Sequence, residues 1–265
     1  MAIAPPKQHL GVAFWGRITN LLVLFAVIFP ATSFANDLIT GARFTEPTKR
    51  YAHGVLGDSI EYGALEITVE HDAAKGNLSR SAVQKRSVQL IRLPLNRVFE
   101  DLAPRLIDVT GDGAPEVVVV ETQVNKGAQL AVYSAKGKKL AATPHIGQTH
   151  RWLAPIGAAD VDGDGHIEIA YIDRPHLAKT LRLWRYKNGK LREVAALKGL
   201  TNHQIGWDFI ASGLRDCGSN PEMVTADAGW KHIMATRYKN GKITARRIGA
   251  YKGPSSIVRA LSCAK

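Results

Sequence analysis

The chain has 265 residues, and its 35 Lys and Arg side chains outnumber its 23 Asp and Glu side chains, so the formal net charge is +12. Hydrophobic residues make up 45% and charged residues 22%, which excludes wholesale disorder and allows one large domain or two small ones. The two cysteines exclude a disulfide-rich scaffold and a cysteine-based zinc cluster.

The first 35 residues have the pattern of a secretory signal peptide. An apolar run at 21–29 is followed by a proline and by small residues at Ser33 and Ala35, which predicts cleavage after Ala35. An uncleaved N-terminal anchor is the alternative, although the run is about half as long as a membrane span requires. The mature domain is then 36–265, in an exported protein that is periplasmic, at the cell surface or secreted.

Export changes the meaning of the positive charge. Basic proteins often bind nucleic acid, but an exported protein meets lipid head groups, cell-wall polymers and acidic polysaccharides instead. We therefore expect no nucleic-acid partner and treat an acidic polymer as a candidate partner. The alternative is that the charge only keeps the protein soluble.

An internal repeat of about 53 residues is visible in the mature domain. The motif at 108–116, Asp-Val-Thr-Gly-Asp-Gly-Ala-Pro-Glu, returns at 160–168 as Asp-Val-Asp-Gly-Asp-Gly-His-Ile-Glu. Degenerate copies lie at 214–222 and at 53–61. Four glutamates therefore mark four units: Glu61, Glu116, Glu168 and Glu222.

A second marker keeps the same spacing and helps to define the strands. The segment 185–191, Arg-Tyr-Lys-Asn-Gly-Lys-Leu, recurs almost unchanged at 237–243. Its Asn-Gly pair favours the positive φ angles of a two-residue hairpin turn. The valines at 117–120 are typical of a strand that is buried on both faces.

The sequence pattern of each unit therefore predicts four short strands. A four-stranded sheet repeated at this spacing is typical of a β-propeller blade. We predict an all-β propeller of four to five blades, in which the segments 36–50 and 256–264 are available to close the ring. An open stack or a two-sheet sandwich is the structural alternative.

The loop at 160–168 has the composition of a calcium site. Asp160, Asp162 and Asp164 stand at positions 1, 3 and 5, His166 at position 7 offers its backbone carbonyl, and Glu168 stands at position 9. Alternate residues of a tight loop converge on one point, and hard oxygen ligands of this kind bind Ca²⁺. An empty Asp/Gly-rich turn is the alternative.

The loop at 108–116 predicts a weaker site of the same kind. It keeps Asp108, Asp112 and Glu116, with Ala114 at position 7, but Thr110 replaces the carboxylate at position 3. The two degenerate loops keep too few carboxylates, so we expect them to fold without metal and their glutamates to bond to neighbouring backbone.

These motifs resemble FG-GAP/VCBS-type repeats, the propeller repeats of integrin α-subunit heads and many secreted bacterial proteins. The resemblance is strongest over 105–200 and weakest over 41–104, and the chain lacks the Phe-Gly pair of that family. It implies a propeller fold with structural Ca²⁺ in the loops between the first two strands of a blade, and a role in recognition rather than a particular reaction.

In such a propeller the loops on the face opposite the calcium loops are the expected ligand loops. They contain His150, Arg151, Arg174 and His176, side chains that suit an acidic or sugar-like ligand. A solvated loop surface is the alternative for these four residues. Trp152 and Trp207 recur before two of the acidic loops, which favours packing between blades.

The sequence contains no nucleophile elbow, zinc-protease motif or phosphate-binding glycine loop. We therefore predict no enzyme and no catalytic residues, and expect a recognition or scaffold module with a protein or glycan partner. A propeller hydrolase of sugar or phosphate esters and a purely structural envelope protein are the alternatives. In an oxidising compartment Cys217 and Cys263 are expected to pair and tether the C-terminus to the last unit, the alternative being two buried thiols.

Overall fold

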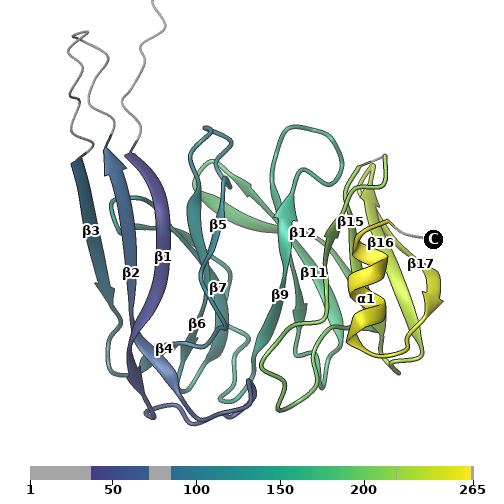
Figure 1. Ribbon diagram of the computed structural model, residues 1–265, viewed down its shortest axis with the longest axis horizontal. Coiled ribbons are helices and arrows are strands. Elements are labelled where there is room, and N and C mark those ends of the chain that lie inside the picture. Colours follow the sequence, from purple (N-terminus) through teal and green to yellow (C-terminus); the bar gives the residue numbers. More distant parts are fainter. Residues whose placement is uncertain (1–36, 72–84, 219, 264–265) are drawn as a thin grey trace, which may run out of the picture. The chain divides into compact units, whose positions relative to one another are not determined.

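The computed structural model describes residues 37–71, 85–218 and 220–263, and the predicted signal segment lies outside these ranges. The described residues form β-strands and a single α-helix, α1 (Pro254–Leu261), as Figure 1 shows. Among the described residues, no helix is long and apolar enough to cross a membrane.

Hydrogen bonding divides the strands into three sheets that follow one another along the chain. The first contains β1 (Asp37–Thr48), β2 (Glu61–His71), β3 (Lys85–Arg92), β4 (Arg97–Phe99), β5 (Arg105–Ile107), β6 (Glu116–Gln123), β7 (Gly127–Tyr133) and β8 (Lys139–Ala142). The second contains β9 (Leu153–Ala159), β10 (Glu168–Asp173), β11 (Thr180–Lys187) and β12 (Lys190–Lys198). The third contains β13 (Leu200–Thr201), β14 (Gly213–Arg215), β15 (Glu222–Asp227), β16 (His232–Lys239) and β17 (Lys242–Ala250).

The repeat predicted from the sequence corresponds to a repeated strand arrangement. Glu116, Glu168 and Glu222 each begin the second strand of a unit, and each is paired with the last residue of the preceding antiparallel strand. The hairpin turn between β11 and β12 is Asn188-Gly189, and both residues have positive φ angles, 53° and 71°. The turn between β16 and β17 is built in the same way.

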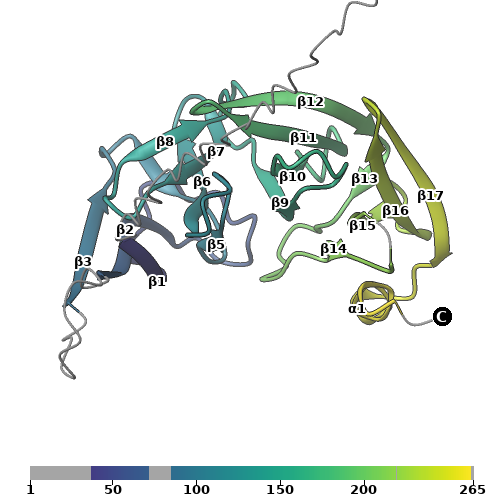
Figure 2. The ribbon, with the colours of Figure 1, turned by 90° about the horizontal axis from the view of Figure 1, so that it is seen from above.

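The valine run in β6 is buried on both faces, as predicted. Val118 and Val120 pack in one hydrophobic cluster, which also contains Trp152 and Ile169 of the second unit. Their neighbours Val117 and Val119 point to the other face and pack with strands β1 and β2. Neighbouring units thus bury each other's sheet faces without a covering layer of helices, and Figure 2 shows the sheets side by side.

The first unit differs from the other three. Its loop at 49–60 precedes Glu61 in sequence as the acidic loops precede the other glutamates. However, Val55 in this loop accepts a hydrogen bond from the Gly206 N–H, and Tyr51 accepts one from the His150 N–H. His150 shortly precedes Leu153, which pairs with Asp173 at the end of β10 remote from the 160–168 loop. Figure 1 shows the β1–β2 loop at the edge opposite the β5–β6 loop.

The C-terminal stretch is a helix and not the strand that ring closure would use. Pro254 stands in the first turn of α1, where its missing N–H costs no hydrogen bond. Ile257 of α1 packs with Val224 and Ile233 of the last sheet. The predicted disulfide between Cys217 and Cys263 is present and ties the residues after α1 to the loop before β15. Segment 37–48 likewise pairs with β2 as strand β1 and not with the C-terminal stretch.

The chain is therefore an all-β protein of several sheets, consistent with a propeller-like fold. Inner strand β9 lies beside β14 of the last sheet, and outer strand β12 lies beside β8 and β17. Because strands of the first two units share one sheet, the hydrogen bonding does not separate the units into blades, and the count of four or five blades stays a prediction.

Candidate functional site

The two predicted calcium loops have the same local structure. In the third unit, the Asp160 carboxylate accepts hydrogen bonds from the backbone N–H groups of Gly163, Asp164 and Gly165. In the second unit, Asp108 accepts the corresponding bonds from residues 111, 112 and 113. The first aspartate of each motif thus holds its loop closed, and the glycines at positions 4 and 6 supply the positive φ angles of the turn.

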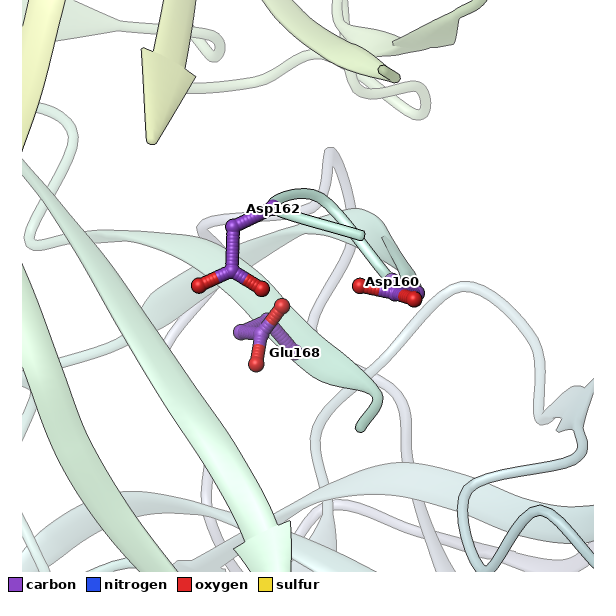
Figure 3. Close-up of side chains that lie close together, drawn as sticks. All are labelled: Asp160, Asp162 and Glu168. Atoms are coloured by element: carbon purple, nitrogen blue, oxygen red, sulfur yellow. The ribbon is translucent and has the colours of Figure 1, made fainter. Parts of the chain in front are cut away.

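The third-unit loop brings carboxylates together, as Figure 3 shows. Oxygen atoms of Asp160, Asp162 and Glu168 lie within 4.8 Å of one another. Asp164 turns toward Arg185 of β11 instead, and the Arg185 guanidinium donates to Asp164, Asp162 and Glu168 at 2.6, 2.8 and 2.5 Å. Burial raises the pKa of Glu168, while the hydrogen bond from Arg185 acts in the opposite direction.

The donor set of this loop fits a hard divalent cation. Asp162 Oδ1 is buried and accepts no hydrogen bond from any residue that the structure describes, so one anionic oxygen of the cluster is left for a ligand. Four carboxylates stand against a single guanidinium, which leaves net negative charge for a cation to neutralise. Asp160, Asp162 and Glu168 are the side chains that would hold it, whereas Asp164, also predicted as a ligand together with the His166 carbonyl, is paired with Arg185.

The second-unit loop fits a cation less well. Thr110 donates its backbone N–H and its hydroxyl to Glu116, and Val109 donates a further N–H, so the Glu116 carboxylate is already satisfied. Among the described residues, no three carboxylates meet at this loop. Asp108 and Asp112 are engaged by backbone N–H groups, and Ala114 contributes its own N–H to Asp112.

The two degenerate loops show different solutions, and neither matches the expected backbone bonding. Glu222 forms ion pairs with Arg215, Arg237 and Arg246, which hold its pKa below the usual range against the opposing effect of burial. Glu61 is buried, and burial, with the negative charges of Glu100 and other acids nearby, raises its pKa to about 9. In the fourth unit, arginine side chains therefore supply the positive charge beside the glutamate that begins the second strand.

At the opposite end of the strands lies a cavity of about 370 Å³. Four segments distant in sequence contribute to its wall: the β1–β2 loop, the residues before β9, the β10–β11 loop and the loop after β13. The four predicted ligand residues, His150, Arg151, Arg174 and His176, all line it. Its other lining residues are His53, Val55, Trp152, Pro175, Leu177 and Ile205.

The cavity residue His176 is hydrogen-bonded to a second histidine, His203, which does not itself line the cavity. His203 is buried, and its Nε2 lies 2.9 Å from the Trp207 carbonyl oxygen. His203 Nδ1 lies 3.0 Å from His176 Nε2. Burial lowers the pKa of both rings, and for His176 the neighbouring His203 and His53 help to lower it to about 4. Both imidazoles are therefore neutral near pH 7.

The cavity residue His53 belongs to a histidine–carboxylate pair that sequence reasoning did not identify. His53 Nδ1 is hydrogen-bonded to Glu100, whose side chain is wholly buried and also accepts the Thr122 hydroxyl. The His53 ring stacks on His150 with 4.8 Å between the ring centroids. His53 lies in the degenerate 53–61 motif and Glu100 lies in none of the repeated motifs, so the sequence pattern did not predict their contact. The fold brings the two side chains together.

The two arginines of the cavity are not equivalent. Arg174 forms a bidentate ion pair with Asp173, at 2.8 and 3.1 Å. Arg151 donates to the His150 carbonyl, and within the described part of the chain no carboxylate is paired with it. Trp152 is buried against the core and donates its ring N–H to the Glu100 carbonyl, so it packs between units and also backs the cavity.

The fold and these loops define a class: an all-β, propeller-like protein built from sheets with an acidic turn before the second strand. Residues 108–171 match the FG-GAP-like repeat, so the chain carries the repeat predicted from its loops over this segment. The match spans the second-unit loop, the third-unit loop and the start of β10.

Among solved structures, the chain is similar to the crystal structure of the exotype rhamnogalacturonan lyase YesX, with 16% identity and a TM-score of 0.37. The alignment covers 69% of this chain and 41% of that one, so the chain spans well under half of the lyase's length. At this level the likeness carries no conclusion about substrate or activity. No curated protein matches the chain.

Proposed function

We propose that the protein is an exported, calcium-binding, propeller-like module that recognises a partner carrying acidic groups, with an acidic glycan as the first candidate and a protein as the second. The observation that carries this proposal is the cavity, because three segments distant in sequence bring Arg151 and three histidines to one concave site. Its volume lies in the range of small-molecule sites, about 300–1,000 Å³. The Cys217–Cys263 disulfide is compatible with export.

In this proposal Ca²⁺ has a structural role. Bound at the third-unit loop, it would neutralise carboxylates that otherwise repel one another, and the orphaned Asp162 oxygen supports such a ligand. The loop lies at the end of β10 remote from the cavity. Calcium would therefore stabilise the fold without touching the partner.

Thermal unfolding in EDTA and in excess Ca²⁺ tests the metal. A ligand at a hundredfold excess over Kd stabilises the native state by about 2.7 kcal/mol. We expect a higher Tm in Ca²⁺ for the wild type and a much smaller shift for Asp160→Ala and Asp162→Asn. An unchanged wild-type Tm across a wide Ca²⁺ range would refute the metal assignment while leaving the fold intact.

Titration with glycans tests the recognition role. We expect binding to carboxylated polysaccharides and not to a neutral glucan, with an affinity that falls as salt rises, because screening weakens charge attraction. Arg151→Gln should weaken this binding at least tenfold. Equal affinity for neutral and acidic polymers, or an affinity for acidic polymers that Arg151→Gln leaves unchanged, would contradict the proposal.

A hydrolase of sugar or phosphate esters is the second candidate function, and the His53–Glu100 pair is the observation that favours it. In this pair the buried Glu100 carboxylate holds the His53 imidazole by a hydrogen bond. A histidine positioned in this way can act as a general base in catalysis. Release of product from esterified glycans or phosphate esters, lost in His53→Gln but not in Arg247→Gln at an exposed strand position, would establish this candidate. Binding without product release supports the recognition module.

A further inference from the structure

The histidine chain determines which kind of hydrogen-bonding group the cavity presents. A backbone carbonyl only accepts hydrogen bonds, so His203 Nε2, 2.9 Å from the Trp207 oxygen, carries the proton. The neutral His203 ring then has a bare Nδ1, and His176 Nε2 must donate to it. The proton of the neutral His176 ring is thus on Nε2, and its Nδ1 is a lone-pair acceptor.

This acceptor is open to a ligand. His176 lines the cavity, and among the described residues the hydrogen bond of its ring is the one between Nε2 and His203, which leaves Nδ1 for a ligand. The lowered pKa values of His176 and His203 keep both rings neutral near pH 7, so the acceptor is not converted into a donor there. A ligand group that meets His176 Nδ1 must therefore donate a hydrogen bond, as a hydroxyl does.

The same cavity presents a positive charge, Arg151, that is paired with no carboxylate among the described residues. The Arg151 guanidinium bonds to a neutral carbonyl, whereas Arg174 is already neutralised by Asp173. A planar guanidinium matches a carboxylate through two parallel hydrogen bonds. The ligand is therefore expected to carry a carboxylate as well as a hydroxyl.

The rim supplies the third part of the recognition surface. Leu177 and Ile205 are 63% and 72% exposed and line the cavity from two different loops. These two side chains give the cavity an apolar edge beside its polar groups. Such side chains suit the apolar C–H face of a sugar ring and offer little to a small inorganic anion.

We propose that the cavity binds a hydroxycarboxylate, the carboxylate on Arg151 and a hydroxyl on His176 Nδ1, with the uronic acid unit of a glycan as the fitting form. This inference rests on the proposed recognition function and narrows it to a ligand class. It also distinguishes a sugar acid from a neutral sugar, a simple carboxylate and phosphate.

The test is a calorimetric titration of the full-length protein with four probes: galacturonate, galactose, acetate and inorganic phosphate. We expect galacturonate to bind at least tenfold more tightly than each of the other three. A galacturonate oligomer, titrated in parallel, distinguishes a chain unit from a free hydroxy acid, because the rim residues add affinity only for the chain.

Two variants separate the roles of the two groups. Arg151→Gln should weaken galacturonate binding at least tenfold by removing the charge. His176→Phe keeps a ring of similar shape without the acceptor, so it should bring the affinity for galacturonate close to that for acetate. Arg247→Gln, at an exposed position of β17, is the matched control and should leave binding unchanged.

The outcomes separate this inference from the function on which it rests. If acidic polysaccharides bind in an Arg151-dependent way but galacturonate binds no better than acetate or phosphate, the hydroxycarboxylate assignment is wrong and recognition stands. If His176→Phe keeps full discrimination, the acceptor assignment is wrong. If neither polymer nor monosaccharide binds, the hydroxycarboxylate inference and the acidic glycan as partner are both overturned.

Discussion

Arg185 and Glu168 are directly paired across the neighbouring strands β11 and β10, and the Arg185 guanidinium donates to the Glu168 carboxylate at 2.5 Å. The same guanidinium reaches Asp162 and Asp164, so this arginine is the internal counter-ion of the acidic loop. In the next unit Arg237 pairs with Glu222 in the corresponding way. An arginine of the third strand thus neutralises the glutamate that begins the second strand.

This relationship predicts a competition between Arg185 and Ca²⁺. Arg185→Gln should increase the affinity of the loop for Ca²⁺ several-fold, because the bound ion no longer has to displace a cation from Asp162 and Glu168. Without Ca²⁺ the same variant should be less stable, because the carboxylates lose their counter-ion. Calcium titration calorimetry and melts in EDTA measure the two effects. Arg192→Gln, exposed on β12, is the control, and unchanged Ca²⁺ affinity in Arg185→Gln would contradict the competition.

Gly127 supports the segment that carries Arg151. Its φ angle is +72°, and a Cβ there would lie 2.3 Å from the Gln148 carbonyl oxygen and 2.9 Å from that of Arg151. Gly127→Ala should therefore destabilise the protein by about 1–3 kcal/mol, the range for a strained backbone position, and weaken binding in the cavity. Denaturant unfolding and ligand titration measure both.

Gly147→Ala is the control for this variant. Gly147 also has a positive φ angle and lies in the segment before β9, but a Cβ there meets no atom within 4 Å. Gly147→Ala should destabilise the protein only because alanine disfavours a positive φ angle, and it should leave the position of Arg151 unchanged. If both variants bind ligand equally well, close packing at Gly127 does not position the cavity segment.

Glu61 predicts a pH dependence of stability. Burial, followed by the charges of Glu100 and Asp58, raises its pKa to about 9, whereas an unfolded glutamate has a pKa of about 4.3. Between these values the folded protein holds a proton that the unfolded chain releases, so this group makes the free energy of unfolding fall as pH rises.

Glu61→Gln removes this contribution. We expect the variant to be more stable than the wild type near pH 8 and the two to converge near pH 4, where both side chains are neutral. Urea unfolding at a series of pH values measures the difference. A constant difference between the two proteins from pH 4 to pH 9 would show that Glu61 titrates as an ordinary carboxyl group.

The disulfide is expected to hold α1 to the last sheet. Cys217 and Cys263 are separated by 46 residues, and the chain-entropy model gives such a loop roughly 4 kcal/mol. The Arg215 guanidinium also donates to the Ala260 carbonyl, so the helix has a second attachment. The double variant Cys217→Ser, Cys263→Ser should have a lower Tm than the wild type. Asp160→Ala, measured in Ca²⁺-free buffer, is the comparison variant with a substitution in a different loop. A Tm unchanged by loss of the disulfide would show that packing of Ile257 and the Arg215 hydrogen bond are sufficient to hold the helix.

Local spacing in the sequence determined the strand edges and turns. The glutamates at 116, 168 and 222 begin second strands, the Asn-Gly pairs form hairpin turns, and the two cysteines are bonded. The strand starts and the turns depend on residues within a few positions of one another, and two cysteines allow only one pairing within the chain. The FG-GAP-like repeat over 108–171 is likewise a local pattern.

Tertiary structure decided the rest. The loop before Glu61 resembles the other repeat loops in spacing, yet long-range contacts with Gly206 and His150 place it beside the cavity. Those contacts put His53 against Glu100 and close the cavity around Arg151 and His176. Arg185 reaches the acidic loop only because β11 pairs with β10 in one particular register. Residues distant in sequence, such as His53 and Glu100, meet through strand pairing and burial, and no local pattern in the sequence predicts these contacts.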